Sequence, residues 1–88
     1  MEREILMVSS ASIALNFYNK NPNAIDEEIF QHLADHISNE SIKDEKTKRN
    51  MIASANMAIK LKRNTPNSEK QILRKIIQEI PRIIQELD

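Results

Sequence analysis

The 88-residue chain contains no glycine, and this absence restricts its fold more than any other feature. Phosphate-binding loops and dinucleotide-binding fingerprints need glycine for tight turns and for close approach of the backbone to the ligand. The favoured two-residue turns of β-hairpins also lose their preferred residue. The sequence therefore excludes these nucleotide sites and favours an all-α fold.

Cysteine is also absent, which excludes disulfide bonds, thiol nucleophiles and zinc sites built on thiolates. Hydrophobic residues make up 40% of the chain and charged residues 30%, a balance typical of a globular protein rather than a disordered one. The chain has fourteen isoleucines, and its only aromatic residues are Phe17, Tyr18 and Phe30. We therefore expect an aliphatic core.

The first expected helix runs from about Glu2 to Tyr18 or Asn19. Its apolar residues lie around most of the helix circumference, and such a helix is either buried centrally or shared with another subunit. The segment Asn19–Asn23 should end this helix, because the residue before a proline avoids the helical region and asparagine suits turns.

A second helix is expected from Pro22 or Ala24 to about Ser38. Two N-caps are compatible with the sequence, namely Asn21, which places proline at the first helical position, or Asn23. Apolar residues at every fourth position form one stripe: Ile25, Ile29, Leu33 and Ile37. This spacing predicts an amphipathic helix with one buried face.

A third helix is expected to begin near Ser41, which has Asp44 three residues later, as in a capping pair. Ala55 and Ala58 in this helix predict a close approach to a neighbouring helix. The segment Thr65–Ser68 should then break the chain, because it combines a proline with residues that favour turns.

Ser68 and Gln71 match a capping box at the start of a fourth helix. Its apolar residues alternate at spacings of three and four, as in a coiled-coil seam. They are Leu73, Ile76, Ile80, Ile83 and Leu87, and the flanking Ile72, Ile77 and Ile84 widen the stripe.

Pro81 lies inside this pattern, where a proline costs about 3 kcal/mol or bends the helix. Because the apolar pattern continues through it, we expect one helix kinked at Pro81, with a break at Ile80 as the alternative. The sequence thus predicts an all-α, compact bundle of about four helices that forms a single domain over residues 1–88.

The strongest candidate for a metal site is Glu28 with His32 and His36, spaced four apart, and the adjacent Asp35. Two histidines one turn apart can share a metal ion, and a nearby carboxylate could be a third ligand. However, helical spacing places His36 within the apolar arc around Ile29 and His32 at its border. We therefore predict packing or interface roles for both histidines, no metal site and no cofactor.

Charge is distributed unevenly, although the formal net charge is zero. Residues 1–45 have a net charge of −6, and residues 46–75 have a net charge of +8. Candidate phosphate-binding residues in the basic segment are Arg49, Lys60, Lys62, Arg63, Arg74 and Lys75. Two structural roles would also account for these basic residues: ion pairs with the acidic half of the chain, and a favourable interaction with the dipole at a helix C-terminus. A small nucleic-acid-associated protein is therefore our alternative function, without base stacking because the segment lacks aromatic residues.

The first and last expected helices carry more apolar residues than one face of a four-helix core needs. Exposed aliphatic patches mark association surfaces, and a homodimer with an isologous interface is the commonest way to cover them. No arrangement of serine, histidine and carboxylate residues matches a catalytic pattern. We therefore predict a non-enzymatic helical interaction module that self-associates, with a further protein partner or a small apolar ligand left open.

The short apolar run Ile5–Val8 is preceded by Glu2 and Glu4, where a signal peptide carries positive charge. It is also too short to span a bilayer. We expect a cytoplasmic protein with no membrane partner.

The region from Ile29 to Ile59, about a third of the chain, contains the stretches Ile29–Leu33, Ile37–Ile42 and Lys48–Ile59. This region resembles a small uncharacterised archaeal family of helical proteins. The last stretch contains an Arg-Asn pair at Arg49 followed by an alanine-rich helix, although this chain lacks the family's proline before that pair. The resemblance implies a compact helical bundle of unknown function.

Overall fold

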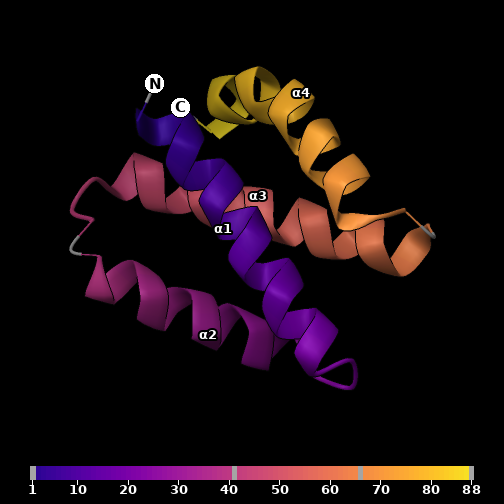
Figure 1. Ribbon diagram of the computed structural model, residues 1–88. Coiled ribbons are helices and arrows are strands. Elements are labelled where there is room, and N and C mark those ends of the chain that lie inside the picture. Colours follow the sequence, from indigo (N-terminus) through magenta and orange to yellow (C-terminus); the bar gives the residue numbers. More distant parts are fainter. Residues whose placement is uncertain (1, 41, 66, 88) are drawn as a thin grey trace.

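The computed structural model describes residues 2–40, 42–65 and 67–87. Four helices account for most of these residues (Figure 1): α1 (Glu2–Lys20), α2 (Asp26–Asn39), α3 (Glu45–Asn64) and α4 (Glu69–Leu87). None of the described residues forms a strand. The predicted all-α bundle of about four helices is confirmed.

Helix α1 is apolar on several sides because it packs against each of the other three helices. Its most extensive contact is with α3, which it crosses in Figure 1. Both helices bury several small residues, and a short side chain lets two helix backbones approach closely. These small residues are Ser10, Ala11 and Ala14 from α1, and Ser54, Ala55 and Ala58 from α3.

Two contacts fix the relative direction of α1 and α3. Arg3 near the start of α1 lies 3.8 Å from the carboxylate of Asp44, which immediately precedes α3. Tyr18 near the end of α1 lies beneath the guanidinium of Arg63 near the end of α3. The two helices therefore run in the same direction, with α2 and α4 on opposite flanks and out of contact with one another in the described part of the chain.

The core is aliphatic, as the composition predicts. Among the described residues its buried members are methionine, leucine, isoleucine and alanine, and the three aromatic residues pack on it while partly exposed. Its buried residues are Met7, Ala11, Ala14, Leu15, Ile29, Leu33, Ile37, Met51, Ala55, Ala58, Ile59, Ile72, Ile76, Ile80 and Ile83.

Helix α2 begins later than predicted, and neither Asn21 nor Asn23 caps it. The N-cap is Ile25, which is in an extended conformation and donates its backbone N–H to the Glu28 carboxylate at 3.2 Å. Asn21 instead ends α1, because its side-chain amide donates to the carbonyl oxygen of Phe17 at 3.0 Å. A carboxylate one turn into the helix thus replaces the side-chain cap that the sequence suggested.

Helix α3 is capped by Asp44, whereas the predicted cap Ser41 lies outside the described residues. The Asp44 carboxylate accepts a hydrogen bond from the backbone N–H of Lys46 at 3.3 Å and from the Thr47 hydroxyl at 2.6 Å. A short polar side chain in an extended conformation is the standard solution for the unpaired N–H groups of a first turn.

The capping box at the start of α4 is confirmed. Gln71 donates its backbone N–H to the Ser68 hydroxyl at 3.2 Å, and the Gln71 side chain accepts from the Ser68 N–H at 3.0 Å. The helix then continues through Pro81 to Leu87, so the alternative of a break at Ile80 is wrong. The kink at Pro81 stays a prediction.

Candidate functional site

The most exposed isoleucines on the helices lie on one surface between α1 and α4. We call this the α1–α4 surface and define it by Ile5, Val8, Leu73 and Ile77, with the buried Ile80 at its base. Ile5 is 67% exposed and Ile77 is 55% exposed. Large aliphatic side chains this accessible, and next to one another, are typical of association surfaces.

Two shallow hollows form this surface and share Ile77. The first has a volume of about 450 Å³ and is lined by Glu4, Ile5, Val8, Ser9, Ile77 and Ile80. The second has a volume of about 580 Å³ and is lined by Glu69, Lys70, Leu73, Arg74 and Ile77. Ile77 therefore lies at the middle of the surface.

The width of the apolar stripe on α4 explains why isoleucine remains exposed there. The buried positions are Ile72, Ile76, Ile80 and Ile83. Two residues of the predicted seam are therefore not in the core. Leu73 is only partly buried, and Ile72 is buried in its place. Leu87, at the end of the helix, is 39% exposed. One neighbouring helix on each side covers the centre of the stripe and leaves its margin, with Ile77, facing solvent.

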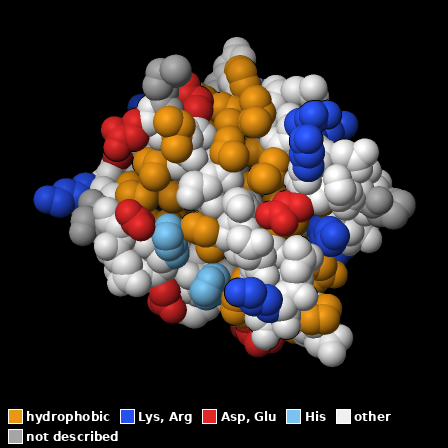
Figure 2. Space-filling model, in the orientation of Figure 1, with side chains coloured by type: hydrophobic (Ala, Val, Ile, Leu, Met, Phe, Trp, Pro, Cys, Tyr) orange, Lys and Arg blue, Asp and Glu red, His pale blue; other side chains and the backbone are white. Residues whose placement is uncertain are grey.

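Charged side chains flank the two ends of the α1–α4 surface with opposite signs. Glu4 lies at the end formed by α1, whereas Glu69, Lys70 and Arg74 lie at the end formed by the first turns of α4, where two cations and one carboxylate give a net positive charge. Figure 2 shows hydrophobic side chains grouped between α1 and α4, with acidic and basic side chains around them. Hydrogen bonds at the start of α1 lower the pKa of Glu4, so its carboxylate is ionised at neutral pH.

A second apolar hollow lies where α2, α3 and the end of α4 meet. It has a volume of about 360 Å³, and its lining residues are Phe30, Arg49, Ile52, Ala53, Asn56 and Leu87. Ile52 is 44% exposed, which is less than either isoleucine of the α1–α4 surface. This hollow is therefore the weaker candidate for an association surface.

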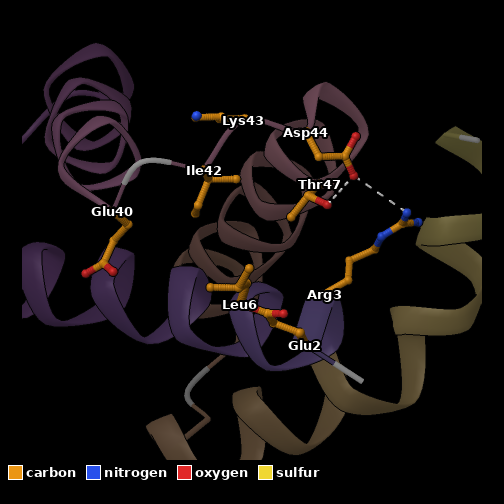
Figure 3. A pocket seen from close by; sticks show the side chains of 8 residues that line it. All are labelled: Glu2, Arg3, Leu6, Glu40, Ile42, Lys43, Asp44 and Thr47. Carbon is orange, nitrogen blue, oxygen red and sulfur yellow. Dashed lines mark hydrogen bonds and ion pairs between the residues drawn. The ribbon is translucent and has the colours of Figure 1, made fainter.

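A polar hollow of about 310 Å³ lies at the start of α1 and α3 (Figure 3). Leu6 and Ile42 point toward one another inside it, and Arg3 and Thr47 converge on Asp44. The Thr47 hydroxyl is the main cause of the lowered pKa of Asp44. Because this carboxylate caps α3 and accepts from Thr47, it has a structural role at this end of the bundle.

The histidines and their neighbouring carboxylates each have a separate partner. The ring of His32 stacks on Phe17 with centroids 4.5 Å apart, and His36 Nε2 lies 3.7 Å from the Glu40 carboxylate. Glu28 is used in capping α2, and Asp35 accepts from Gln31 at 3.0 Å. Across residues 2–40, 42–65 and 67–87, no three histidine or carboxylate side chains are arranged to hold a metal ion.

The candidate phosphate-binding residues lie on several sides of the molecule. Arg63 contacts three elements, because it pairs with Asp26, donates to the carbonyl of Ala24 at 3.4 Å and lies 5.5 Å above the Tyr18 ring. Asp26 is the main cause of the raised pKa of Arg63. This pair joins the acidic and basic halves of the chain within one molecule.

Of the other basic candidates, Lys60 precedes Arg63 by three residues and so lies on the same face of α3, whereas the remaining ones do not converge on Arg63. Arg49 lines the hollow beside Phe30, whereas Arg74 lines the second hollow of the α1–α4 surface, next to Lys75 in the sequence. Lys60 and Lys62 are two residues apart on α3, which separates their directions by about 200°. Figure 2 likewise shows lysine and arginine side chains of this face in separate groups.

Asn50 is a buried polar residue that the sequence analysis missed. It is fully buried in α3, and neither its amide nitrogen nor its amide oxygen has a hydrogen-bond partner among the described residues. Thr47, Asn50 and Ser54 are spaced three and four residues apart, which places them on one face of a helix. This spacing could have predicted a row of buried polar residues along α3.

No helix in the described part of the chain combines the length and apolar character that crossing a membrane requires. Comparison with known proteins found no matching family model, no matching curated protein and no matching solved structure. The function must therefore be argued from the surface of this chain alone.

Proposed function

We propose that the protein is a non-enzymatic helical interaction module that forms a homodimer through the α1–α4 surface. The observation that carries this proposal is the exposure of Ile5 and Ile77 beside one another, at 67% and 55%. A covering partner would remove this aliphatic area from water, which is the main favourable contribution to most protein association. The cytoplasm remains our expected location for the protein.

The expected strength of the dimer follows from the exposed aliphatic area. Full burial of one isoleucine side chain contributes about 1.5–3 kcal/mol, so Ile5 and Ile77 each have roughly 1–2 kcal/mol left to gain. A twofold interface counts each residue twice, which gives about 4–8 kcal/mol before Val8 and Leu73 are included. Association itself costs at least about 4 kcal/mol. The difference is at most about 4 kcal/mol, which corresponds to a Kd near 1 mM, so with Val8 and Leu73 included we expect a weak, reversible dimer with a Kd of about 0.1–1 mM.

The non-enzymatic part of the proposal is supported by the use of the polar side chains. His36 lies beside Glu40, and His32 stacks on Phe17. The carboxylates of Asp44 and Glu28 cap helices. Each of these contacts has a structural role, and none brings an acid, a base and a nucleophile together in one hollow.

Sedimentation equilibrium at protein concentrations from about 0.05 to 2 mM, which bracket the expected Kd, tests the proposal with two matched variants. Ile77→Glu places a charge in the middle of the α1–α4 surface, and Ile52→Glu places the same charge on an exposed isoleucine of α3. Glutamate is a good helix former, so both variants should fold. We expect the wild type and Ile52→Glu to approach twice the chain mass and Ile77→Glu to stay monomeric. A wild type with the mass of one chain throughout this range would refute the proposal.

A further inference from the structure

The α1–α4 surface has the layout of a self-complementary interface, with an apolar centre and opposite charges at its two ends. Ile77 belongs to both hollows and so marks the centre. Glu4 lies at one end, and Glu69, Lys70 and Arg74, which together have a net positive charge, lie at the other. From Glu69 to Ile80 this surface extends about 16 Å along α4, which spans three helical turns.

We propose that the occupant of this surface is a second copy of the chain, docked antiparallel about a twofold axis that passes near Ile77. This inference rests on the proposed homodimer and adds its geometry. In an isologous interface, if residue i contacts residue j of the other copy, then j also contacts i. A rotation about Ile77 therefore places the Glu4 end of each copy against the Lys70 and Arg74 end of the other.

The shapes of the two hollows fit this arrangement. Ile5 projects from α1 with two thirds of its side chain exposed, and the second hollow offers an apolar base of Leu73 and Ile77. The antiparallel rotation brings Ile5 of one copy over the partner's Leu73, and the same contact repeats on the other side of the axis. Both exposed isoleucines are then covered by one interface.

The charges distinguish this arrangement from a head-to-head one. Superposing like ends would bring Lys70 and Arg74 of both copies together, and like charges facing one another across an interface are strongly unfavourable. The antiparallel arrangement pairs each Glu4 with the partner's Arg74. Electrostatic complementarity therefore fixes the direction in which the apolar centre is covered.

Cysteine cross-linking measures this geometry directly, because the chain has no cysteine of its own. Ile77→Cys should form a disulfide-linked dimer under mild oxidation, since a residue near the twofold axis faces its own copy at a distance that a disulfide can bridge. Ile25→Cys is the matched control, because Ile25 is 58% exposed but lies at the start of α2. We expect the control to cross-link at least about tenfold more slowly, as for encounters outside a specific interface.

Charge reversal tests the predicted end-to-end pairing. Glu4→Lys and Arg74→Glu should each raise the dimer dissociation constant several-fold, by roughly three- to tenfold, because each places like charges together. The double variant restores an opposite pair, and its dissociation constant should return to within about twofold of the wild type. Circular dichroism of all variants checks that the helices are retained.

The outcomes separate this geometry from the homodimer itself. If sedimentation shows a dimer but Ile77→Cys cross-links no faster than Ile25→Cys, the antiparallel geometry is wrong and the homodimer stands. A double charge variant that remains as weak as the single variants would overturn the geometry in the same way. A wild type that stays monomeric would overturn both.

Discussion

Replacing Asn50 with leucine should stabilise the protein. The Asn50 side chain is fully buried, and both of its polar atoms lack a hydrogen-bond partner within residues 2–40, 42–65 and 67–87. A buried polar group left unpaired costs about 1–3 kcal/mol in protein mutational data. Leucine has the same branching as asparagine, with bulkier methyl ends and no polar atom, so Asn50→Leu should recover much of that cost.

The expected gain is about 1–3 kcal/mol in the free energy of unfolding, and each kcal/mol shifts the Tm of a domain of this size by about 4–8 °C. Urea and thermal unfolding followed by circular dichroism measure both quantities. The measurement belongs in the Ile77→Glu background, because a dimer makes the apparent stability depend on protein concentration.

Ser54→Ala is the control for Asn50→Leu. Ser54 is also fully buried in α3, but its hydroxyl donates to the backbone carbonyl of Asn50 at 2.9 Å. Removing a satisfied hydroxyl should change the stability by no more than about 1 kcal/mol. If Asn50→Leu lowers the free energy of unfolding by more than about 1 kcal/mol, the Asn50 amide is hydrogen-bonded in the native protein and our reasoning is wrong.

Three further predictions concern the helix ends and their charges. Ser68→Ala removes the reciprocal cap of α4 and should cost about 1 kcal/mol in urea unfolding, whereas Ser38→Ala, at an exposed position near the end of α2, should cost less than half of that. Arg63→Met keeps an apolar side chain near Tyr18 but removes the contacts with Asp26 and Ala24, and should cost no more than about 1 kcal/mol because the ion pair is exposed. A loss of about 2 kcal/mol or more in low salt would contradict this. Thr47→Val removes the hydrogen bond that lowers the pKa of Asp44, so an NMR titration should show that pKa rising toward 3.8. Since the folded pKa of Asp44 lies below its unfolded value, its stabilising contribution is present above pH 3.8 and is lost as the pH falls through the folded pKa. Thr47→Val should therefore lose less stability than the wild type on acidification, and an equal loss would contradict the assignment.

The sequence predicts the four helices well because the signals that separate them are local. Ser68 and Gln71 form the expected capping box, and α1 ends at Lys20, within the segment Asn19–Asn23 that was expected to end it. The start of α2 was wrong for a physical reason. A search for polar N-caps finds Asn21 and Asn23, whereas the actual cap uses the backbone of Ile25 with the side chain of Glu28.

The candidate surface was predicted only in outline, because exposure depends on how helices pack. The apolar surplus of α1 is visible in the sequence, yet three neighbouring helices cover most of it and leave Ile5 and Val8. On α4 the sequence pattern gives equal weight to Ile72 and Ile77, but α4 is rotated so that the first is buried and the second exposed. The neighbouring helices determine how a helix is rotated about its own axis, and the spacing of its apolar residues does not predict this rotation.

The positions of the basic side chains on the surface could not be predicted from the sequence either. Lys60, Lys62 and Arg63 are adjacent in the chain, which suggested one phosphate-binding group. In the fold Arg63 is engaged by Asp26, and the helical rotation sends Lys60 and Lys62 in different directions. Composition gives the amount of charge, whereas the geometry of a binding surface needs the packed structure.

An isotope-filtered NOE experiment on a dimer with one methyl-labelled copy and one unlabelled copy tests the central claim most directly. Such an experiment detects only contacts between copies, and methyl groups report on the aliphatic side chains that define the α1–α4 surface. We expect intermolecular signals at the methyl groups of Ile5, Leu73 and Ile77, and none at Ile25. Intermolecular signals confined to Ile52 and Leu87, or no intermolecular signal at all, would contradict the account.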